Sequence, residues 1–395
     1  MILLTKAISL FAGERLKKWP NKYVIGLTGN IGTGKSVVRR MLEHLGAYGI
    51  DADALAHRAI AKDAPGYDKV VETFGRFLLA PDEQIDRAKL GRLVFSDPEA
   101  LATLESIIHP LVIQAVDLLI KRAPQQVVVI EAIKLLETDL ADMCDAIWVV
   151  YTPPEIQLQR LMFNRNMTEK DARQRIASQI PQESRFARAN VIIKNVSTYH
   201  ETWRQVTSEW QRHIPTKPVG EHPVSQPVRL PLGEVNVQRA GPKNVKEIAR
   251  LYKELSPDKK EISPSDVMEA FGEKAFLLLR VEKNIMGILA WQVENLVSRT
   301  TEILLDPALP PAQYLPILIR EMEHASNDLQ CEASLIFVPP HLSRHDSLWN
   351  SLGYVEKKPS DLNILAWQEA AEDSMPKDSV LFFKQLRPDR VLKPI

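Results

Sequence analysis

The stretch IGLTGNIGTGKS, residues 25–36, decides the fold of the first part of this chain. An apolar run ends inside it at residue 28, and a helix-period run, VVRRMLEHL, follows it, so a glycine-rich turn is expected to join a strand to a helix. Glycines let backbone N–H groups curl around phosphate oxygens at a helix start, where the dipole also favours anions. The pattern G-x4-G-K-S therefore predicts a site for the phosphates of ATP, and a turn with an accidental lysine is the alternative.

Two side chains of this loop have chemistry of their own. Lys35 is expected to reach the β- and γ-phosphates, and Ser36 is expected to offer its hydroxyl to Mg²⁺. The predicted cofactors are therefore ATP and Mg²⁺. The motif residues predicted to hold them are Gly29, Asn30, Ile31, Gly32, Thr33, Gly34, Lys35 and Ser36.

Short apolar runs alternate with helix-period segments from residue 23 to about residue 206. This alternation is typical of an α/β fold, a parallel sheet with helices on both faces. The expected strands are 23–28, 47–51, 127–131, 146–150 and 191–194.

A proline-rich stretch separates this block from a second one. Hairpin-like strands, expected at 275–281, 285–294 and 299–306, mix with helix-period runs in the second block and indicate an α+β fold. The predicted divisions are an N-terminal extension over 1–21, a nucleotide-binding domain over 22–211, a linker over 212–231 and a second domain over 232–395.

The overall composition excludes several classes of protein. Lys plus Arg and Asp plus Glu number 50 each, so no bulk charge favours nucleic acid. The cysteines, Cys144 and Cys331, form no ligand or redox motif, which favours free thiols in a reducing compartment. No run approaches the ~18 apolar residues needed to span a bilayer, and the N-terminus lacks the order of a signal peptide. We expect a cytoplasmic protein with a small-molecule substrate, without nucleic acid or membrane as partner; the oligomeric state stays open.

Two aspartates, Asp51 and Asp53, follow the strand expected at 47–51. The carboxyl ends of strands face the ligand crevice of such a fold. One carboxylate can accept a proton from an attacking hydroxyl while the other holds Mg²⁺ through water, although helix capping is the ordinary role of such a residue. Their place beside the phosphate loop favours catalysis.

A basic segment over residues 157–188 is the third candidate. Most of its arginines are expected on solvated helix faces, but phosphoryl transfer needs cations that close over the transferred group. A helical hairpin at about 155–180 would form such a lid, with Arg160 as the first candidate. No N-K-x-D motif follows the loop, which argues against a GTPase.

These motifs together resemble the dephospho-coenzyme A kinase family. The resemblance covers about residues 22–206. It is carried by the phosphate loop, IDADALAH (50–57), the run 85–112 with its pair His109-Pro110, PEIQLQRLM (154–162) and ARQRIASQ (172–179). It implies transfer of the ATP γ-phosphoryl group to the ribose 3′-hydroxyl of dephospho-coenzyme A.

The resemblance also implies roles for single residues. Residues 32–37, Val37 included, would surround the phosphates, and residues 54–120 would form a helical acceptor subdomain. The implied roles are Asp53 as base at the 3′-hydroxyl, Arg160 as lid cation, Thr28 on the acceptor side and His109 near the subdomain hinge, which leaves Asp51 for the metal. From chemistry alone, His109 is more ordinarily a structural histidine.

Two departures from the family pattern change these assignments. The proline expected after the central strand is absent from residues 131–137, where Lys134 offers a phosphate contact instead. The arginine expected shortly after Arg160 falls on Asn164, so its role is assigned to Arg165.

The second block resembles the GNAT acetyltransferase fold, more weakly, in element order and in the run LWNSLGYVEKK (348–358). The glycine-containing run that cradles a pyrophosphate in that family is replaced by DPALPPAQYLP (306–316). We expect a non-catalytic module, with a remodelled acyl-coenzyme A site as the alternative.

Two other functions remain open for the whole chain. One is a kinase for another small alcohol or nucleotide. The other is a nucleotide-binding sensor whose C-terminal module recognises an acylated or coenzyme-A-bearing partner.

Overall fold

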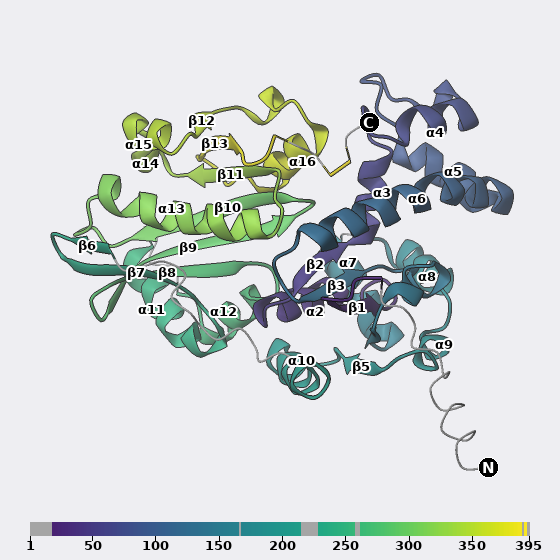
Figure 1. The fold of residues 1–395 in the computed structure, drawn as a ribbon, viewed down its shortest axis with the longest axis horizontal. Helices are drawn as coiled ribbons and strands as arrows, with labels where there is room; N and C mark the ends of the chain where they lie inside the picture. Colours follow the sequence, from purple (N-terminus) through teal and green to yellow (C-terminus); the bar gives the residue numbers. More distant parts are fainter. Residues whose placement is uncertain (1–17, 166, 215–227, 257–260, 389–390, 393–395) are drawn as a thin grey trace, which may run out of the picture.

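The computed structural model shows two halves, each built on its own sheet (Figure 1). It describes residues 18–165, 167–214, 228–256, 261–388 and 391–392. The predicted fold class is confirmed, because a parallel α/β half precedes a mixed α+β half.

The first half contains a five-stranded parallel sheet with the order β2-β3-β1-β4-β5. Its strands are β1 (Tyr23–Thr28), β2 (Tyr48–Asp51), β3 (Val127–Glu131), β4 (Ala146–Tyr151) and β5 (Val191–Lys194). β1 is central, between β3 and β4, and the chain crosses to its other side after β3. The phosphate loop therefore leaves the sheet at its switch point, where such folds bind ligands.

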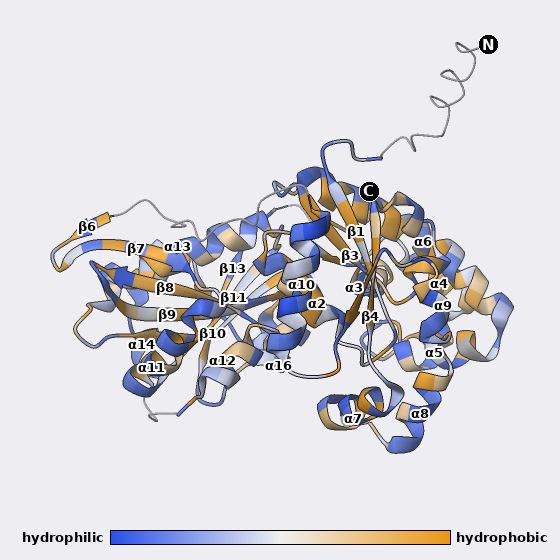
Figure 2. Ribbon diagram, turned by 90° about the horizontal axis from the view of Figure 1, so that it is seen from below, coloured by the Kyte–Doolittle hydropathy of each residue, from blue (hydrophilic) through white to orange (hydrophobic). Residues whose placement is uncertain are grey.

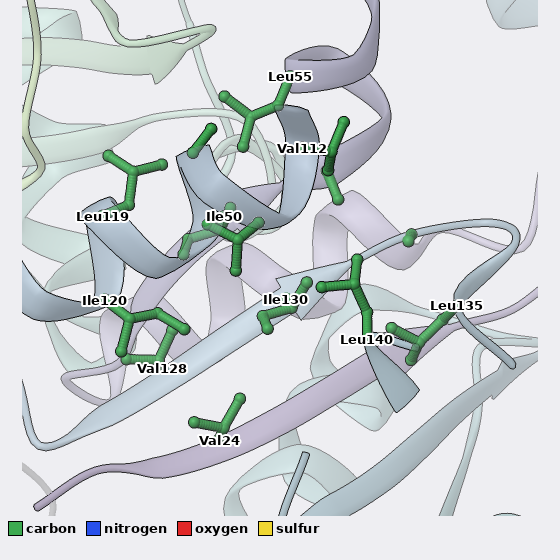
Figure 3. Close-up of a cluster of buried hydrophobic side chains, with 14 of the residues drawn as sticks. Val24, Ile50, Leu55, Val112, Leu119, Ile120, Val128, Ile130, Leu135 and Leu140 are labelled. Carbon is green, nitrogen blue, oxygen red and sulfur yellow. The ribbon is translucent and has the colours of Figure 1, made fainter. Parts of the chain in front are cut away.

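Helices cover both faces of this sheet, which explains why its strands are apolar on both sides. Helices α2 (Lys35–His44) and α10 (Tyr199–His213) pack on one face, and α3 (Ala52–Ala59) and α6 (Pro98–Arg122) pack on the other. Figure 3 shows the second of these contacts, where Leu55 and Leu119 meet Ile50 and Ile130 of the sheet. In Figure 2 the apolar strands β1, β3 and β4 run between more polar helices.

Two helical additions surround the carboxyl end of the sheet. The helices α4 (Tyr67–Phe74) and α5 (Arg87–Ser96) pack on α6 around a small apolar cluster of their own. The predicted hairpin at 155–180 forms α7 (Pro154–Arg165) and α8 (Glu169–Ala177), and α9 (Gln182–Phe186) follows it. Leu161 and Ala172 of the hairpin pack against Ile31 of the phosphate loop.

Helix α6 corrects one expectation from the sequence. It is the one helix of the described residues that is long and apolar enough to cross a membrane by length and composition, although no such run was expected. Its buried side chains, among them Val112, Val116 and Leu119, belong to the core of the first half. A long helix in a protein core can have the same length and composition, because its apolar side chains pack against other parts of the protein.

The second half contains an eight-stranded sheet in the order β12-β13-β11-β10-β9-β8-β7-β6, in which β10 and β11 pair in parallel and the other pairs are antiparallel. Its strands are β6 (Val228–Leu230), β7 (Gly233–Arg239), β8 (Ala275–Val281), β9 (Asn284–Glu294), β10 (Val297–Leu305), β11 (Ala333–Val338), β12 (Val355–Glu356) and β13 (Val380–Gln385).

Helices also cover both faces of the second sheet. Helix α11 (Val245–Leu255) packs on one face together with α12 (Pro264–Ala270), and α13 (Pro311–Asp328) packs on the other. The remaining helices are α14 (Pro340–Ser343), α15 (Asp346–Ser351) and α16 (Leu365–Ser374). The strands β6 and β12 are too short to leave a readable alternation in the sequence.

Some residues that the sequence placed in the extension or the linker pack with the folded halves instead. Trp19, placed in the N-terminal extension, is buried in the core, and its Nε1 donates a hydrogen bond to Asp117 at 3.0 Å. Residues 228–230, placed in the linker, pair with β7. Residues 1–17 of the extension and 215–227 of the linker lie outside the described residues.

The two halves share a buried junction. Arg58 of α3 forms an ion pair with Glu332 of the second half at 2.6 Å, and the two side chains are 8% and 1% exposed. Arg58 also donates to the carbonyl oxygen of Asn295 at 2.9 Å. Near the C-terminus, Leu392 packs into the core of the first half. The second half therefore packs directly against the first half and is not joined to it by the linker alone.

We expect Arg58→Met to destabilise the protein by about 3–5 kcal/mol, because it removes one partner of a buried ion pair across the junction. Urea unfolding would measure the change. The double variant Arg58→Met/Glu332→Met is the control, and it should recover most of the loss because no unpaired charge remains. A single variant as stable as the parent protein would show that the ion pair does not hold the junction.

Candidate active site

The phosphate loop runs from the end of β1 into the first turn of α2. The predicted phosphate-binding residues, Gly29, Asn30, Ile31, Gly32, Thr33, Gly34, Lys35, Ser36 and Val37, all lie on it. Gly34 has a φ of 85°, and a Cβ there would lie 2.2 Å from Nδ2 of Asn195, so only glycine fits. Gly34 is also the N-cap of α2 and brings no capping side chain, which suits a helix N-terminus that receives an anion.

Polar side chains hold the outer side of this loop. Arg160 donates to the carbonyl oxygens of Gly32, Thr33 and Asn195 at 3.3, 3.4 and 3.1 Å. Thr152 donates to the Thr33 carbonyl oxygen at 3.1 Å. In this structure Arg160 therefore positions the loop, and its role as a lid cation stays a prediction.

The first half of the loop contacts the segment after α8. The side-chain amide of Asn30 donates to the carbonyl oxygen of Ile180 at 3.0 Å, and the backbone N–H of Ile31 donates to Gln179 at 2.7 Å. These protein contacts occupy both groups, so phosphate contacts by Asn30 and Ile31 stay predictions.

Lys35 is the buried cation of the loop, with 7% of its surface exposed. Its Nζ donates to the carbonyl oxygen of Asn30 at 3.4 Å. Burial lowers the pKa of Lys35, whereas the nearby carboxylates Glu131, Asp53 and Asp51 raise it, and the net effect is a lowered pKa. Arg165, exposed at the end of α7, is close enough to lower it further.

The two aspartates have different surroundings. Asp51 accepts a hydrogen bond from the backbone N–H of Ala54 at 2.8 Å and is the N-cap of α3, as the capping alternative predicted. It lines a cavity of about 50 Å³ at the junction of the two halves. Asp53 accepts from the backbone N–H of Ile133 at 3.0 Å and faces a much larger cavity.

This larger cavity, of about 420 Å³, lies between α3, α5, α6 and the segment after β3. Its walls are largely apolar. Its charged or titratable lining residues include Asp53, His57, Arg87, His109 and Lys134. The structure therefore brings the predicted residues Asp53, His109 and Lys134 to one cavity. The Nζ atom of Lys134 is paired with Glu105 at 2.6 Å.

Comparison with known proteins assigns the first half. The profile of the CoaE family, described as dephospho-CoA kinase, matches residues 23–201. The dephospho-CoA kinase of Streptomyces avermitilis is 46% identical over 187 residues, which are 47% of this chain and 91% of that protein. The chain belongs to the dephospho-CoA kinase family. The match is confined to about half of the chain, and it coincides with the parallel α/β half.

Solved structures resemble each half separately. The dephospho-CoA kinase of Campylobacter jejuni is 29% identical and covers 48% of this chain and 97% of its own, with a TM-score of 0.33. A GNAT-family acetyltransferase of Staphylococcus aureus is 14% identical and covers 39% of this chain and 99% of its own, with a TM-score of 0.31.

Among the dephospho-CoA kinase residues, the sequence did not single out Glu131. The Oγ atom of Ser36 donates to Glu131 at 2.9 Å, and Arg39 donates to its other carboxylate oxygen at 2.8 Å. Burial raises the pKa of Glu131, but Arg39 and Lys35 outweigh burial, and the net effect is a lowered pKa. Its position at the carboxyl end of a strand beside β1 was the available signal.

Arg185 was also not assigned a role. This arginine is 1% exposed and donates to Asn30 of the phosphate loop at 3.1 Å, to Thr28 at 3.2 Å and to the carbonyl oxygen of Ile133 at 3.0 Å. It therefore links the loop to the residue that orients Asp53. Nothing in the sequence distinguished it from its solvated neighbours.

Thr28, expected on the acceptor side, is fully buried and donates to the carbonyl oxygen of Ile133 at 3.1 Å. It is not one of the residues that line the larger cavity. In this structure Thr28 supports the segment that holds Asp53, and direct contact with an acceptor stays a prediction.

The pKa of Asp51 makes a testable prediction about stability. Burial, and then Glu131, raise this pKa to about 6 from 3.8. Between these values the folded state holds a proton that the unfolded state has lost, so this group makes stability fall as pH rises from about 4 to 6. Asp51→Asn keeps a capping side chain and removes the titration. We expect the variant to match the parent protein near pH 4 and to exceed it by about 2 kcal/mol at pH 7 in urea unfolding.

The control for this prediction is Asp86→Asn, at a capping aspartate whose pKa is lowered through hydrogen bonds from Lys89 and Ala88. It should not gain stability over the parent protein as pH rises. A stability difference for Asp51→Asn that is the same at pH 4 and pH 7 would contradict the raised pKa.

Proposed function

We propose that this protein transfers the γ-phosphoryl group of ATP to the ribose 3′-hydroxyl of dephospho-coenzyme A, giving coenzyme A and ADP. The observation that carries the proposal is the position of Asp53. This carboxylate lies in the electrostatic reach of the phosphate-loop lysine, Lys35, and also lines the 420 Å³ cavity. A hydroxyl bound at Asp53 would therefore meet the terminal phosphate bound at the loop.

The chemistry follows from these two charges. The phosphoryl group passes through a transition state whose negative charge spreads over its oxygens, so positioning and cations supply most of the catalysis. Lys35 neutralises that charge. Asp53 orients the 3′-hydroxyl and accepts its proton, and the hydrogen bond from the N–H of Ile133 fixes the carboxylate. Burial raises the pKa of Asp53, Lys35 counters this, and the net effect is a raised pKa, which suits a proton acceptor.

Mg²⁺ fits the donors beside Lys35. Magnesium in such sites takes one or two protein oxygens and completes its shell with phosphate and water. Ser36 supplies a hydroxyl, and Asp51 and Glu131 supply carboxylates that can act through water. No cluster of three His, Cys, Asp or Glu residues within the described ranges could hold a metal alone. Held there by Ser36 and these carboxylates, the ion would neutralise negative charge on the phosphates.

The larger cavity suits the acceptor. Dephospho-coenzyme A carries a diphosphate and a long, mostly uncharged arm. Arg87 and Lys134 supply cations for the diphosphate, and Leu90, Ile108 and Val112 supply apolar walls for the arm. We assign His109 to this acceptor site as well. The free thiols of Cys144 and Cys331 agree with a cytoplasmic location.

A coupled assay of ADP release tests the proposal. Purified full-length protein with ATP and Mg²⁺ should release ADP when dephospho-coenzyme A is added. Adenosine, AMP and pantetheine should give no release above the rate without acceptor. ADP release with one of these acceptors instead would favour a kinase for another small alcohol or nucleotide. Tight ATP binding without ADP release on any acceptor would favour the sensor.

A further inference from the structure

A second large cavity, of about 640 Å³, lies between the two halves of the chain. The first half contributes the last turn of α2, with Glu43 and His44, the segment after it, with Ala47, and Trp203 of α10. The second half contributes the end of β7, parts of β8 and β9, and the last turns of α13. Helix α2 carries the phosphate loop at its other end, so this cavity is separate from the candidate active site.

Arg239, at the end of β7, is a half-buried cation whose Nε atom is fully covered by other residues. Its Nε atom is buried and makes no hydrogen bond with any described residue. No ion pair joins Arg239 to a carboxylate in the part of the chain that the structure describes, and its Cζ atom lies over the ring of Trp291, 5.9 Å from the ring centroid. Burial lowers its pKa, and the nearby carboxylate of Glu43 offsets part of this effect. A desolvated charge that no carboxylate pairs directly costs stability, which favours a role in binding an anion.

A second arginine, Arg40 of α2, adds positive charge near Arg239. It lines a smaller cavity, of about 30 Å³, together with Arg239 and Trp291. Within the described ranges Arg40 also has no hydrogen bond or ion pair through its side chain. His44 lies beside both arginines, and burial together with Arg239 and Arg40 lowers its pKa to about 3. His44 is therefore neutral and does not compete for an anion, but the surrounding field is positive.

The acidic residues of the cavity offset the positive field at Arg239 only in part, through Glu43. Glu43 is held by Arg39 at 2.6 Å. Asp328 is exposed at the end of α13, where water screens its charge. The cavity thus combines a guanidinium that makes no direct ion pair with acidic residues that are paired with Arg39 or exposed to water.

Apolar side chains from both halves line the cavity. Trp203 of α10 and Leu329 are half-buried and offer apolar surface to it, whereas Trp291 of β9 and Leu277 are each 1% exposed and belong to the core of the second half. Aromatic faces bind planar apolar groups, while an arginine fork binds a carboxylate or phosphate through two parallel hydrogen bonds.

We propose that this cavity is a binding site for a small organic anion with a flat apolar body. The carboxylate or phosphate of the ligand contacts Arg239 of the second half, and its body packs against Trp203 of the first half. Because these residues come from both halves, the site exists only when the halves are docked.

The charge requirement can be tested with a pair of probes of the same shape. Isothermal calorimetry on the full chain would compare 2-naphthoate with its neutral amide, 2-naphthamide, and 2-naphthyl phosphate would test the other anion. We expect the naphthoate to bind at least about tenfold more tightly than the amide, since a charged hydrogen-bonded pair contributes that much. Equal affinities for the naphthoate and the amide would overturn the proposal.

Variants place the charge requirement on Arg239. Arg239→Met should abolish the preference for the naphthoate, and Arg250→Met, on the exposed face of α11, should leave it unchanged. Arg40→Gln should weaken naphthoate binding several-fold through the loss of its field. A preference that survives in Arg239→Met, or is lost in Arg250→Met, would contradict the assignment.

Thermal unfolding separates a binding role from a structural one. Removing a half-buried charge that makes no direct ion pair should leave the Tm of Arg239→Met unchanged or raise it. A large fall in Tm would show that Arg239 stabilises the fold and would overturn the proposal. A competition experiment distinguishes this site from the kinase site. Dephospho-coenzyme A and ATP should not displace 2-naphthoate. Displacement by either one would place the probe in the kinase site and overturn the proposal.

Discussion

Replacing Lys35 with methionine is expected to lower kcat by about 100- to 1,000-fold, because a cation aimed at developing phosphate charge is worth this much in a buried site. Methionine keeps the length of the side chain and removes the charge. The three nearby carboxylates, Glu131, Asp53 and Asp51, would then repel the phosphates without compensation. The ADP-release assay at saturating ATP and dephospho-coenzyme A would measure the loss.

The control for Lys35 is Lys121→Met, at an exposed lysine of α6 whose partner is Asp117 at 2.6 Å. Its kcat should stay close to that of the parent protein, because the pair lies away from the loop. If Lys35→Met kept more than about a tenth of the parent rate, Lys35 would not be the main cation of the transition state.

Replacing Asp53 with asparagine is the second change with a large expected effect. Asparagine has the same shape and can still accept the hydrogen bond from Ile133, but it cannot accept a proton. We expect kcat to fall by about 100- to 10,000-fold, as for the loss of a general base. The affinity for ATP, measured by calorimetry, should remain close to that of the parent protein, because Asp53 faces the acceptor cavity.

The matched control is Asp139→Asn, an exposed carboxylate at the same cavity. It should change kcat by less than about threefold, since it is not held beside Lys35. A near-normal rate for Asp53→Asn would show that the base assignment is wrong, and an equal fall for both variants would indicate a general effect of cavity charge.

Local sequence patterns predicted the architecture of the first half correctly. All five parallel strands form at the predicted runs, because strands buried on both faces must be apolar along their whole length. The glycine pattern predicted the loop equally well, since the left-handed backbone at Gly34 is one that other residues rarely adopt. Such features depend on a few neighbours in the chain.

The candidate site was less predictable where a role depends on distant partners. Asp51 and Asp53 are two residues apart, yet one caps α3 at the domain junction and the other faces the acceptor cavity. Glu131 and Arg185 carry no local signal, because their contacts with Ser36 and Asn30 cross 95 and 155 residues of chain. The sequence singled out Arg160 as a candidate, but only the structure shows that it donates hydrogen bonds to carbonyl oxygens of the phosphate loop.

By itself, the amino-acid sequence determined that this protein has a phosphate-binding loop on a parallel α/β half and that an α+β half follows. Steric limits on the backbone and the period of apolar residues act over a few neighbouring positions, so the sequence alone is enough to recognise them. Only the tertiary structure decided that the halves meet through Arg58 and Glu332 and that Arg239 lies in a cavity between them. Burial and charge pairing depend on which surfaces meet, and the chain brings those surfaces together from positions more than 200 residues apart.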